Sequence, residues 1–355
     1  ANLAQPNQLA TLLMLGVVST IYLYENNKIS ERILFVSTFT LLFGVALTQS
    51  RASWLEIAAI IFIATIIKNK IEAKITRHFI LINLIFFVIS VISLPHLSEI
   101  LNLSHRETSQ QLSTGTRPIH WGTVWDSFFI RPWTGFGWNQ ISVAISNTAI
   151  NRPASHEMVE HSHNLILDLI SWNGIPIGSL IILACAAWLA RALIRIKSTE
   201  EAILMAFISI PLSHSLVEFP LEYAYFLFPI GIFIGRFENI QKIKPALIVN
   251  RVFIFTASIA SIIALCFTAY EYFTIEQETR NLKMESQKIG PPINVGENLN
   301  IHLLTQQSNF IKYATTEASE NMTIEESFYI GYVSKTRGLK GEVQLFFEFE
   351  DYNEL

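Results

Sequence analysis

The sequence predicts an all-α polytopic membrane protein, because its apolar residues are both abundant and grouped into long runs. Hydrophobic residues make up 51% of the 355 residues and charged residues only 15%, which is too apolar for an ordinary soluble domain. Runs of roughly 15 to 24 residues with almost no charge recur, close to the length that a bilayer demands. We expect about eight transmembrane helices, although the two runs around Pro220 could form one broken hairpin. The runs cover approximately residues 3–24, 33–49, 52–67, 79–94, 164–190, 202–217, 223–235 and 247–270.

The basic residues predict the sidedness of these helices. Lysines and arginines crowd three connecting segments, at residues 68–77, 191–197 and 236–251. The positive-inside rule assigns all three segments to the cytoplasm, and one alternating topology satisfies them together. The long segment 95–163, which contains no lysine, then lies outside. Because the chain begins within an apolar run, we expect further helices to precede it.

The same pattern divides the chain into five predicted regions. Two of them are groups of transmembrane helices, separated by a long outer loop with an interfacial helix and followed by a polar helical tail and a short β-like segment. Their bounds are 1–94 (helices), 95–163 (loop), 164–270 (helices), 271–321 (tail) and 322–355 (β-like). Nothing in residues 1–321 predicts nucleic-acid binding.

The outer loop is long for a connector, which is typical of a functional segment. It is rich in histidine and contains arginine without lysine. Arginine suits a planar, bidentate partner such as phosphate or pyrophosphate, although each arginine could equally be a solvated loop residue. The histidines are His96, His105, His120, His156, His161 and His163, and the arginines are Arg106, Arg117, Arg131 and Arg152.

Within the loop, the stretch RPIHWGTVWDSFFIRPWTGFGWNQ predicts a helix that lies on the membrane and then a tight reversal. The apolar face of this helix would comprise Trp121, Val124, Trp125, Phe128 and Phe129. Aromatic side chains of this kind sit well at the level of the lipid headgroups, so an anchoring role alone would explain them.

The stretch EHSHNLILDLISWNGIPIG places Glu160, His161 and His163 at the outer mouth of an apolar run. Ionisable groups there are costly and usually functional, and histidine can accept a proton near neutral pH. We expect a helix to begin near Ser162 and to direct these groups into an outward-facing cavity. Three alternatives remain open: a helix-capping cluster, a metal site with Glu160 as third ligand, and a hydrogen-bonded core histidine.

Two further polar clusters fall on the same predicted face. In HSLVEFPLEYAYFLFPIG, the residues His214, Glu218 and Tyr223 flank Pro220 between two apolar runs, and a broken helix at membrane depth needs a cavity or protein around it. In LTQSRASW, Arg51 stands at the outer end of one run, directly before the next. We expect the three clusters to line one outward-opening cavity.

These four stretches, in this order, resemble the O-antigen ligase and polymerase superfamily over approximately residues 1–320. The last stretch and the tail are most similar to the bacterial protein O-oligosaccharyltransferases. The resemblance implies that Arg51 and Arg117 hold the pyrophosphate of a lipid-linked donor and that His163 is the essential histidine, supported by His161 and Glu160. It assigns His214, Glu218 and Tyr223 to positioning of substrate, and it implies neither a metal nor another cofactor.

The resemblance also implies the reaction and the compartment. An oligosaccharide would pass from undecaprenyl pyrophosphate to a Ser or Thr hydroxyl of a periplasmic protein or pilin, at a periplasmic site of a multi-pass protein in the bacterial inner membrane. An O-antigen ligase that uses lipid A core as acceptor is the alternative within the family. A transporter of lipid-linked glycans is the alternative of another class, and it predicts repeated halves that the sequence does not show.

The last residues have a different character. From about Met322 onward, apolar and polar residues alternate around glycines, which predicts strands. Residues 322–355 resemble the N-terminal start of the ribosome-maturation factor RimM, and they are too few to close a barrel. We interpret them as a joined reading frame with its junction near residues 322–327, the alternative being a genuine tail.

Overall fold

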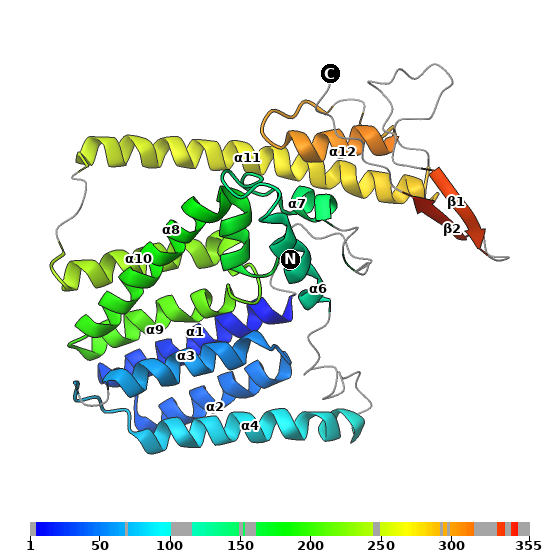
Figure 1. Cartoon of the computed structure of the whole chain (residues 1–355). Helices are drawn as coiled ribbons and strands as arrows, with labels where there is room; N and C mark the ends of the chain where they lie inside the picture. The colour runs from blue at the N-terminus through cyan, green and yellow to red at the C-terminus, as the bar shows by residue number, and fades with distance from the viewer. Residues whose placement is uncertain are drawn as a thin grey trace. The chain divides into compact units, whose positions relative to one another are not determined.

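The computed structural model consists almost entirely of helices, as the sequence predicts (Figure 1). It describes residues 5–67, 70–100, 116–148, 152, 161–243, 249–291, 294–296, 299–315, 332–337 and 342–346, without the side chains of 96–100, 286, 306, 310, 313, 332–337 and 342–346. Its two compact units are Ala1–Lys244 and Pro245–Leu355. The helices of the first unit are α1 (Pro6–Glu25), α2 (Glu31–Leu47), α3 (Ala52–Ile67), α4 (Arg77–Ile100), α6 (Arg117–Ser127), α7 (Ile141–Thr148), α8 (Leu165–Arg195), α9 (Thr199–His214), the 3-10 turn η3 (Pro220–Glu222) and α10 (Ala224–Ile240).

Each of the eight apolar runs lies within or largely overlaps a helix. Four of these helices, α1, α4, α8 and α11 (Arg251–Ser286), are long and apolar enough to cross a membrane. The helices α2, α3, α9 and α10 have only 16 or 17 residues, about 25 Å at 1.5 Å per residue. The chain is thus a multi-pass helical membrane protein, and a total of eight spans stays a prediction.

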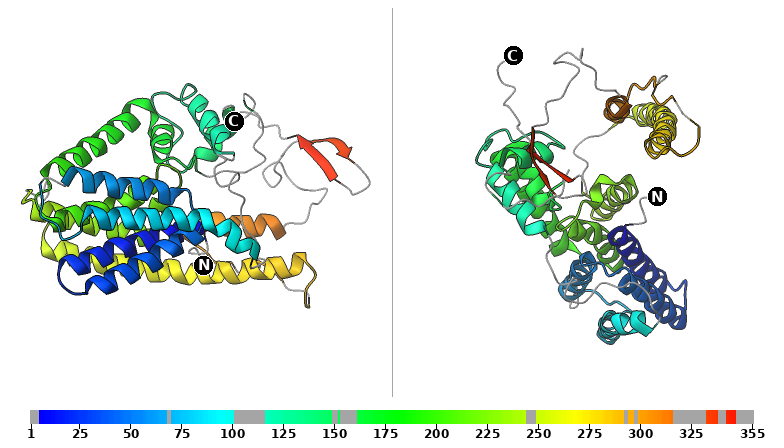
Figure 2. Two further views of the ribbon diagram at one scale, coloured as in Figure 1. Left: turned by 90° about the horizontal axis from the view of Figure 1, so that it is seen from below. Right: turned by 90° about the vertical axis from the view of Figure 1, so that its right-hand side faces the viewer.

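The first unit is organised around α9, which packs against α1, α3 and α10 (Figures 1 and 2). Outside them, α2 packs on α1 and α4 on α2. The core between these helices is aliphatic, with Met14, Met205 and Ile210 almost fully buried. At its start, α9 is fixed by a capping box: the Ser198 hydroxyl accepts from the Glu201 amide, and the Glu201 carboxylate accepts from the Ser198 amide.

The three basic segments meet at one end of this helix bundle. Lys70 donates to the carbonyl of Ile194 at 3.3 Å, and Gln241 donates to the carbonyl of Arg195 at 3.0 Å. At the same end, Lys74 donates to the carbonyl of Glu25 at the end of α1. Since α1 starts and α9 finishes at the other end, the predicted outer clusters lie opposite the basic segments, as the positive-inside rule requires.

Helix α8 is kinked at Gly174, and the loop between α6 and α7 donates hydrogen bonds to the carbonyls that the kink leaves without helical partners. Gly174 has φ 77°, and Pro176 has no N–H to donate. The amides of Phe136 and Gly137 instead donate to the carbonyls of Ser171 and Trp172, at 2.8 and 3.0 Å. The Pro-Trp-Thr-Gly-Phe-Gly-Trp segment is therefore a tight reversal, as predicted, and it holds the kink of α8.

The expected apolar face of the interfacial helix is divided in the structure. Val124 and Phe128 of α6 are buried in a small core with Ile141 and Trp172, whereas Trp125 and Phe129 are 53% and 68% exposed. The reason is that α6 packs against α7 and α8, which cover one side of it. The predicted apolar face is therefore split between a protein-facing part and an exposed pair, and the location of this helix on the membrane surface stays a prediction.

The second unit contains α11, α12 (Thr305–Thr315), β1 (Tyr332–Arg337) and β2 (Glu342–Phe346). Helix α12 lies within the predicted helical tail, residues 271–321, and its start is capped because Glu271 accepts from the amides of His302, Leu303 and Leu304. The predicted strands are also present, as an antiparallel pair with an irregularity between Val333 and Lys335.

The kink of α8 gives a first prediction. A Cβ atom at Gly174 would lie 2.5 Å from the backbone of Trp133, and φ there is positive, so Gly174→Ala should destabilise the protein by about 1–3 kcal/mol. Gly235→Ala is the matched control, since a Cβ there meets nothing within 4 Å. Thermal unfolding in detergent measures both variants. An unchanged midpoint for Gly174→Ala would show that the kink does not need glycine.

Candidate active site

The site is organised around the carboxylate of Glu218, in the loop that follows α9. One oxygen accepts from Arg117, at the start of α6, and from the side-chain amide of Asn7 in α1 at 2.8 Å. The other oxygen lies 2.9 Å from Nδ1 of His163. Glu218 is only 6% exposed, so one buried carboxylate joins residues that are up to 211 positions apart.

The local backbone explains how Glu218 reaches this position. After His214 ends α9, the amides of Val217 and Glu218 both donate to the His214 carbonyl at 3.0 Å. This tight turn directs the loop back toward α1, and Pro220 then starts the short turn η3. The predicted break around Pro220 is thereby confirmed.

His163 is positioned by the start of α8. Its φ is 58°, a left-handed conformation that histidine adopts more readily than most residues. Asn164 follows as the N-cap and accepts from the amides of Ile166 and Leu167. One alternative raised by the sequence was a helix-capping role for this cluster. Asn164 performs the capping, so neither histidine acts as the cap.

Aromatic rings support the two histidines. Phe219 stacks on His161 at 4.7 Å between ring centroids and contacts His163 at 5.1 Å. Tyr223 stacks on the same phenylalanine at 6.1 Å. His161 therefore packs against the ring of Phe219. Its Nδ1 is buried without a hydrogen-bonding partner among the described residues.

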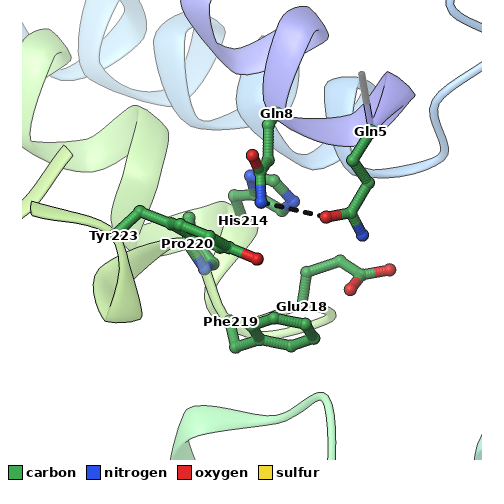
Figure 3. Close-up of a pocket in the computed structure, with 7 residues that line it drawn as sticks. All are labelled: Gln5, Gln8, His214, Glu218, Phe219, Pro220 and Tyr223. Carbon is green, nitrogen blue, oxygen red and sulfur yellow. Dashed lines mark hydrogen bonds between the residues drawn. The ribbon is translucent and has the colours of Figure 1, made fainter. Parts of the chain in front are cut away.

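A small pocket adjoins Glu218 (Figure 3). Figure 3 shows Gln5 and Gln8, from the start of α1, facing the loop residues Glu218 and Phe219. His214, Pro220 and Tyr223 complete the lining. The pocket is thus bounded by amide, carboxylate, imidazole and aromatic groups.

The electrostatics of Glu218 follow from these contacts. Burial raises the pKa of its carboxyl, but the hydrogen bond with His163 and the positive charge of Arg117 more than offset this effect. The net pKa lies below the ordinary value of 4.5, so Glu218 is ionised at neutral pH. An ionised carboxylate can only accept, and His163 must therefore donate its Nδ1 proton to it.

The structure brings together most of the residues that the sequence singled out. Arg117, His163, His161, His214, Glu218 and Tyr223 lie at one end of the bundle in contact with one another or with the pocket. Arg51 directly precedes α3 at the same end, and its convergence with the Glu218 contacts stays a prediction. Glu160 lies outside the described residues. Within the described part of the chain, no group of three histidine, cysteine or acidic residues could hold a metal ion.

Sequence reasoning missed several residues of this region, among them Asn7, Thr11 and Glu56. Thr11 of α1 donates to Glu56 of α3 at 2.5 Å and lies 2.7 Å from Nδ1 of His214. Glu56 is the only charged residue of the apolar run 52–67, a signal that could have identified it. The small polar residues of α1 gave no such signal.

Three family models match parts of the chain. A family model described as O-antigen ligase matches residues 36–183, and one described as virulence factor membrane-bound polymerase, C-terminal, matches residues 202–326. A third, described as protein glycosylation ligase, matches residues 1–24. The chain belongs to the O-antigen ligase family. The resemblance stated from the sequence motifs is thereby confirmed.

Two curated relatives come from Acinetobacter baylyi. A general O-oligosaccharyltransferase is 30% identical over 247 residues, 67% of this chain and 43% of the relative. A ComP-specific O-oligosaccharyltransferase is 30% identical over 283 residues, 78% of this chain and 50% of the relative. The chain spans about half the length of these relatives or less. No solved structure matches the chain. The resemblance of residues 322–355 to RimM has no support from these family models and relatives.

The ionised Glu218 gives a second prediction. A lowered folded-state pKa stabilises the protein above the unfolded value of 4.5, and the stabilisation is lost as pH falls through the folded value. At pH 7, Glu218→Gln should therefore lower the free energy of unfolding by about 1–3 kcal/mol. The difference from wild type should shrink below pH 4.5. Glu222→Gln, at an exposed position of η3, is the control. Equal melting of wild type and Glu218→Gln at pH 7 would contradict the assignment.

Proposed function

We propose that the protein transfers an oligosaccharide from undecaprenyl pyrophosphate to a Ser or Thr hydroxyl of a periplasmic or pilin protein. The observation that carries the proposal is the gathering of Arg117 and His163 on the ionised Glu218, at the end of the bundle opposite the basic segments. The names of the two relatives, both O-oligosaccharyltransferases, support a protein acceptor. The positive-inside rule supports a site on the periplasmic face of the inner membrane.

The proposed reaction requires the site to bind both the acceptor hydroxyl and the pyrophosphate leaving group. The acceptor hydroxyl forms a bond to the anomeric carbon, the bond from that carbon to the pyrophosphate oxygen breaks, and polyprenyl pyrophosphate leaves. Its growing negative charge requires fixed positive groups. Arg117 supplies a guanidinium whose remaining N–H donors match phosphate oxygens, and Arg51 supplies a second one.

Glu218 positions the catalytic groups without contacting the reacting atoms. By holding Arg117 and His163 on its two oxygens, it fixes both before the donor binds, so that little reorganisation is needed during the reaction. His163 directs Nε2 away from Glu218, and no described residue bonds to that nitrogen. We assign it to the pyrophosphate side of the site, next to Arg117. His161, which packs under Phe219, supports it.

The decisive assay offers membranes containing the protein a labelled lipid-linked oligosaccharide with either a pilin-type protein or lipopolysaccharide core. We expect label on the protein acceptor and none with His163→Ala. Transfer to core alone would establish the O-antigen ligase alternative. Translocation of the lipid-linked glycan without transfer to either acceptor would establish the transporter.

The donor site gives a further prediction. Arg117→Lys and Arg51→Lys keep the charge but lose the planar, paired donors, and each should lower kcat/KM for the lipid-linked donor on the order of tenfold or more. Arg236→Lys is the matched control, because Arg236 forms an exposed ion pair with Glu200 at the opposite end of the bundle. Wild-type activity for either variant would remove that arginine from the donor site.

A further inference from the structure

A second polar network lies behind the pocket, deeper in the helix bundle than the Glu218 contacts. Glu56 of α3, Thr11 of α1 and His214 of α9 form a chain in which the side chains are 0%, 0% and 1% exposed. The hydroxyl oxygen of Thr11 lies 2.5 Å from Glu56 and 2.7 Å from Nδ1 of His214. Such a buried network is expensive in an apolar bundle, and the proposed donor site makes no use of it.

The hydrogen-bond directions follow from the chemistry of the middle residue. Thr11 has one hydroxyl proton, and an ionised Glu56 can only accept, so Thr11 donates to Glu56. The Thr11 oxygen must then accept from His214, which places the imidazole proton on Nδ1. Nε2 consequently carries a lone pair. A protonated Glu56 would donate to Thr11 instead, and the Thr11 proton would then go to Nδ1 of His214 or to the Asn7 carbonyl at 3.2 Å. The arrangement used below is the one with Glu56 ionised.

His214 stands at the end of this chain, and it lines the pocket together with Gln8, Glu218 and Tyr223 (Figure 3). Its Nε2 is buried and has no hydrogen-bonding partner among the described residues. A buried nitrogen with an unused lone pair, at the wall of a pocket beside the candidate site, is a group that a substrate hydroxyl would satisfy.

We propose that His214, Thr11 and Glu56 form a proton relay that deprotonates the acceptor hydroxyl. This inference rests on the proposed glycosyl transfer. As the hydroxyl oxygen bonds to the anomeric carbon, its proton passes to Nε2 of His214. The Nδ1 proton passes to Thr11, and the Thr11 proton passes to Glu56. One proton moves from the pocket to the buried carboxylate, and every group in the chain ends with its ordinary valence.

The relay separates the two histidines by function. His163 is bonded to a carboxylate that also binds Arg117, and it belongs to the pyrophosphate side. His214 is linked through a neutral hydroxyl to its own carboxylate, with no arginine between them. The first set neutralises the charge of the leaving group, and the second removes the proton of the nucleophile.

Azide, used in place of the acceptor hydroxyl, distinguishes a relay from a structural network. The azide anion attacks the anomeric carbon without losing a proton, so it needs no base. We expect Thr11→Val and Glu56→Gln to lower kcat for transfer to a protein hydroxyl on the order of 100-fold, with KM for the donor unchanged. Formation of the glycosyl azide should stay within about twofold of wild type. Thr11→Ser keeps the hydroxyl and should restore transfer to within several-fold of wild type.

The matched control is Thr38→Val, which alters a fully buried threonine of α2 that bonds only to its own helix at the Phe35 carbonyl. Equal loss of hydroxyl and azide transfer, or a raised donor KM, would show a structural role and overturn the relay. So would full activity of Thr11→Val. If azide gives no product even with wild type, the kcat contrast between Thr11→Val and Thr11→Ser decides.

The same assay compares the histidines. If the His163→Ala variant loses glycan transfer to a protein hydroxyl but keeps glycan transfer to azide, then His163 is the base and the relay is refuted. Failure of the proposed function itself is visible separately, because the wild-type protein would then transfer no glycan to a protein acceptor.

Discussion

The candidate site depends on one buried carboxylate, that of Glu218. It joins α1 through Asn7, the outer loop through Arg117 and the start of α8 through His163. A lone carboxylate with little exposure would be costly near a membrane, and the positive partners make its ionised form stable. The same contacts fix the two groups that a pyrophosphate leaving group needs, so stability and pre-organisation have a common source.

The kink in α8 is the second structural feature of this region, and the Leu165 amide, at the start of the same helix, donates to the Ser215 carbonyl beside the Glu218 loop at 2.9 Å. A straight α8 would need the Pro176 amide that proline lacks. The glycine-rich reversal between α6 and α7 supplies two amides to the carbonyls that the kink frees, and the close backbone approach there leaves no room for side chains at Gly135 and Gly174. The aromatic loop, read from its composition as a membrane anchor, therefore also shapes the site.

The polar residues of the candidate site lie at one end of the bundle and differ in burial. The Glu218 contacts are the less buried layer, and the chain from His214 to Glu56 is almost fully buried. Intramembrane charges are retained when they perform a task that apolar residues cannot. A site with a charged mouth and a buried network behind it matches a reaction that must neutralise one group and deprotonate another.

The sequence by itself determined the helices and the family, and it predicted their sidedness. Apolar runs and basic segments are local in the chain, and burial in lipid converts them directly into helices and orientation. It also named most of the site residues, because His163, Glu218 and Arg117 lie in recognisable stretches. Only the tertiary structure decided which partners they bind. Asn7 and Thr11 are ordinary polar residues within α1, and contacts across more than 200 positions depend on helix packing that no local pattern encodes.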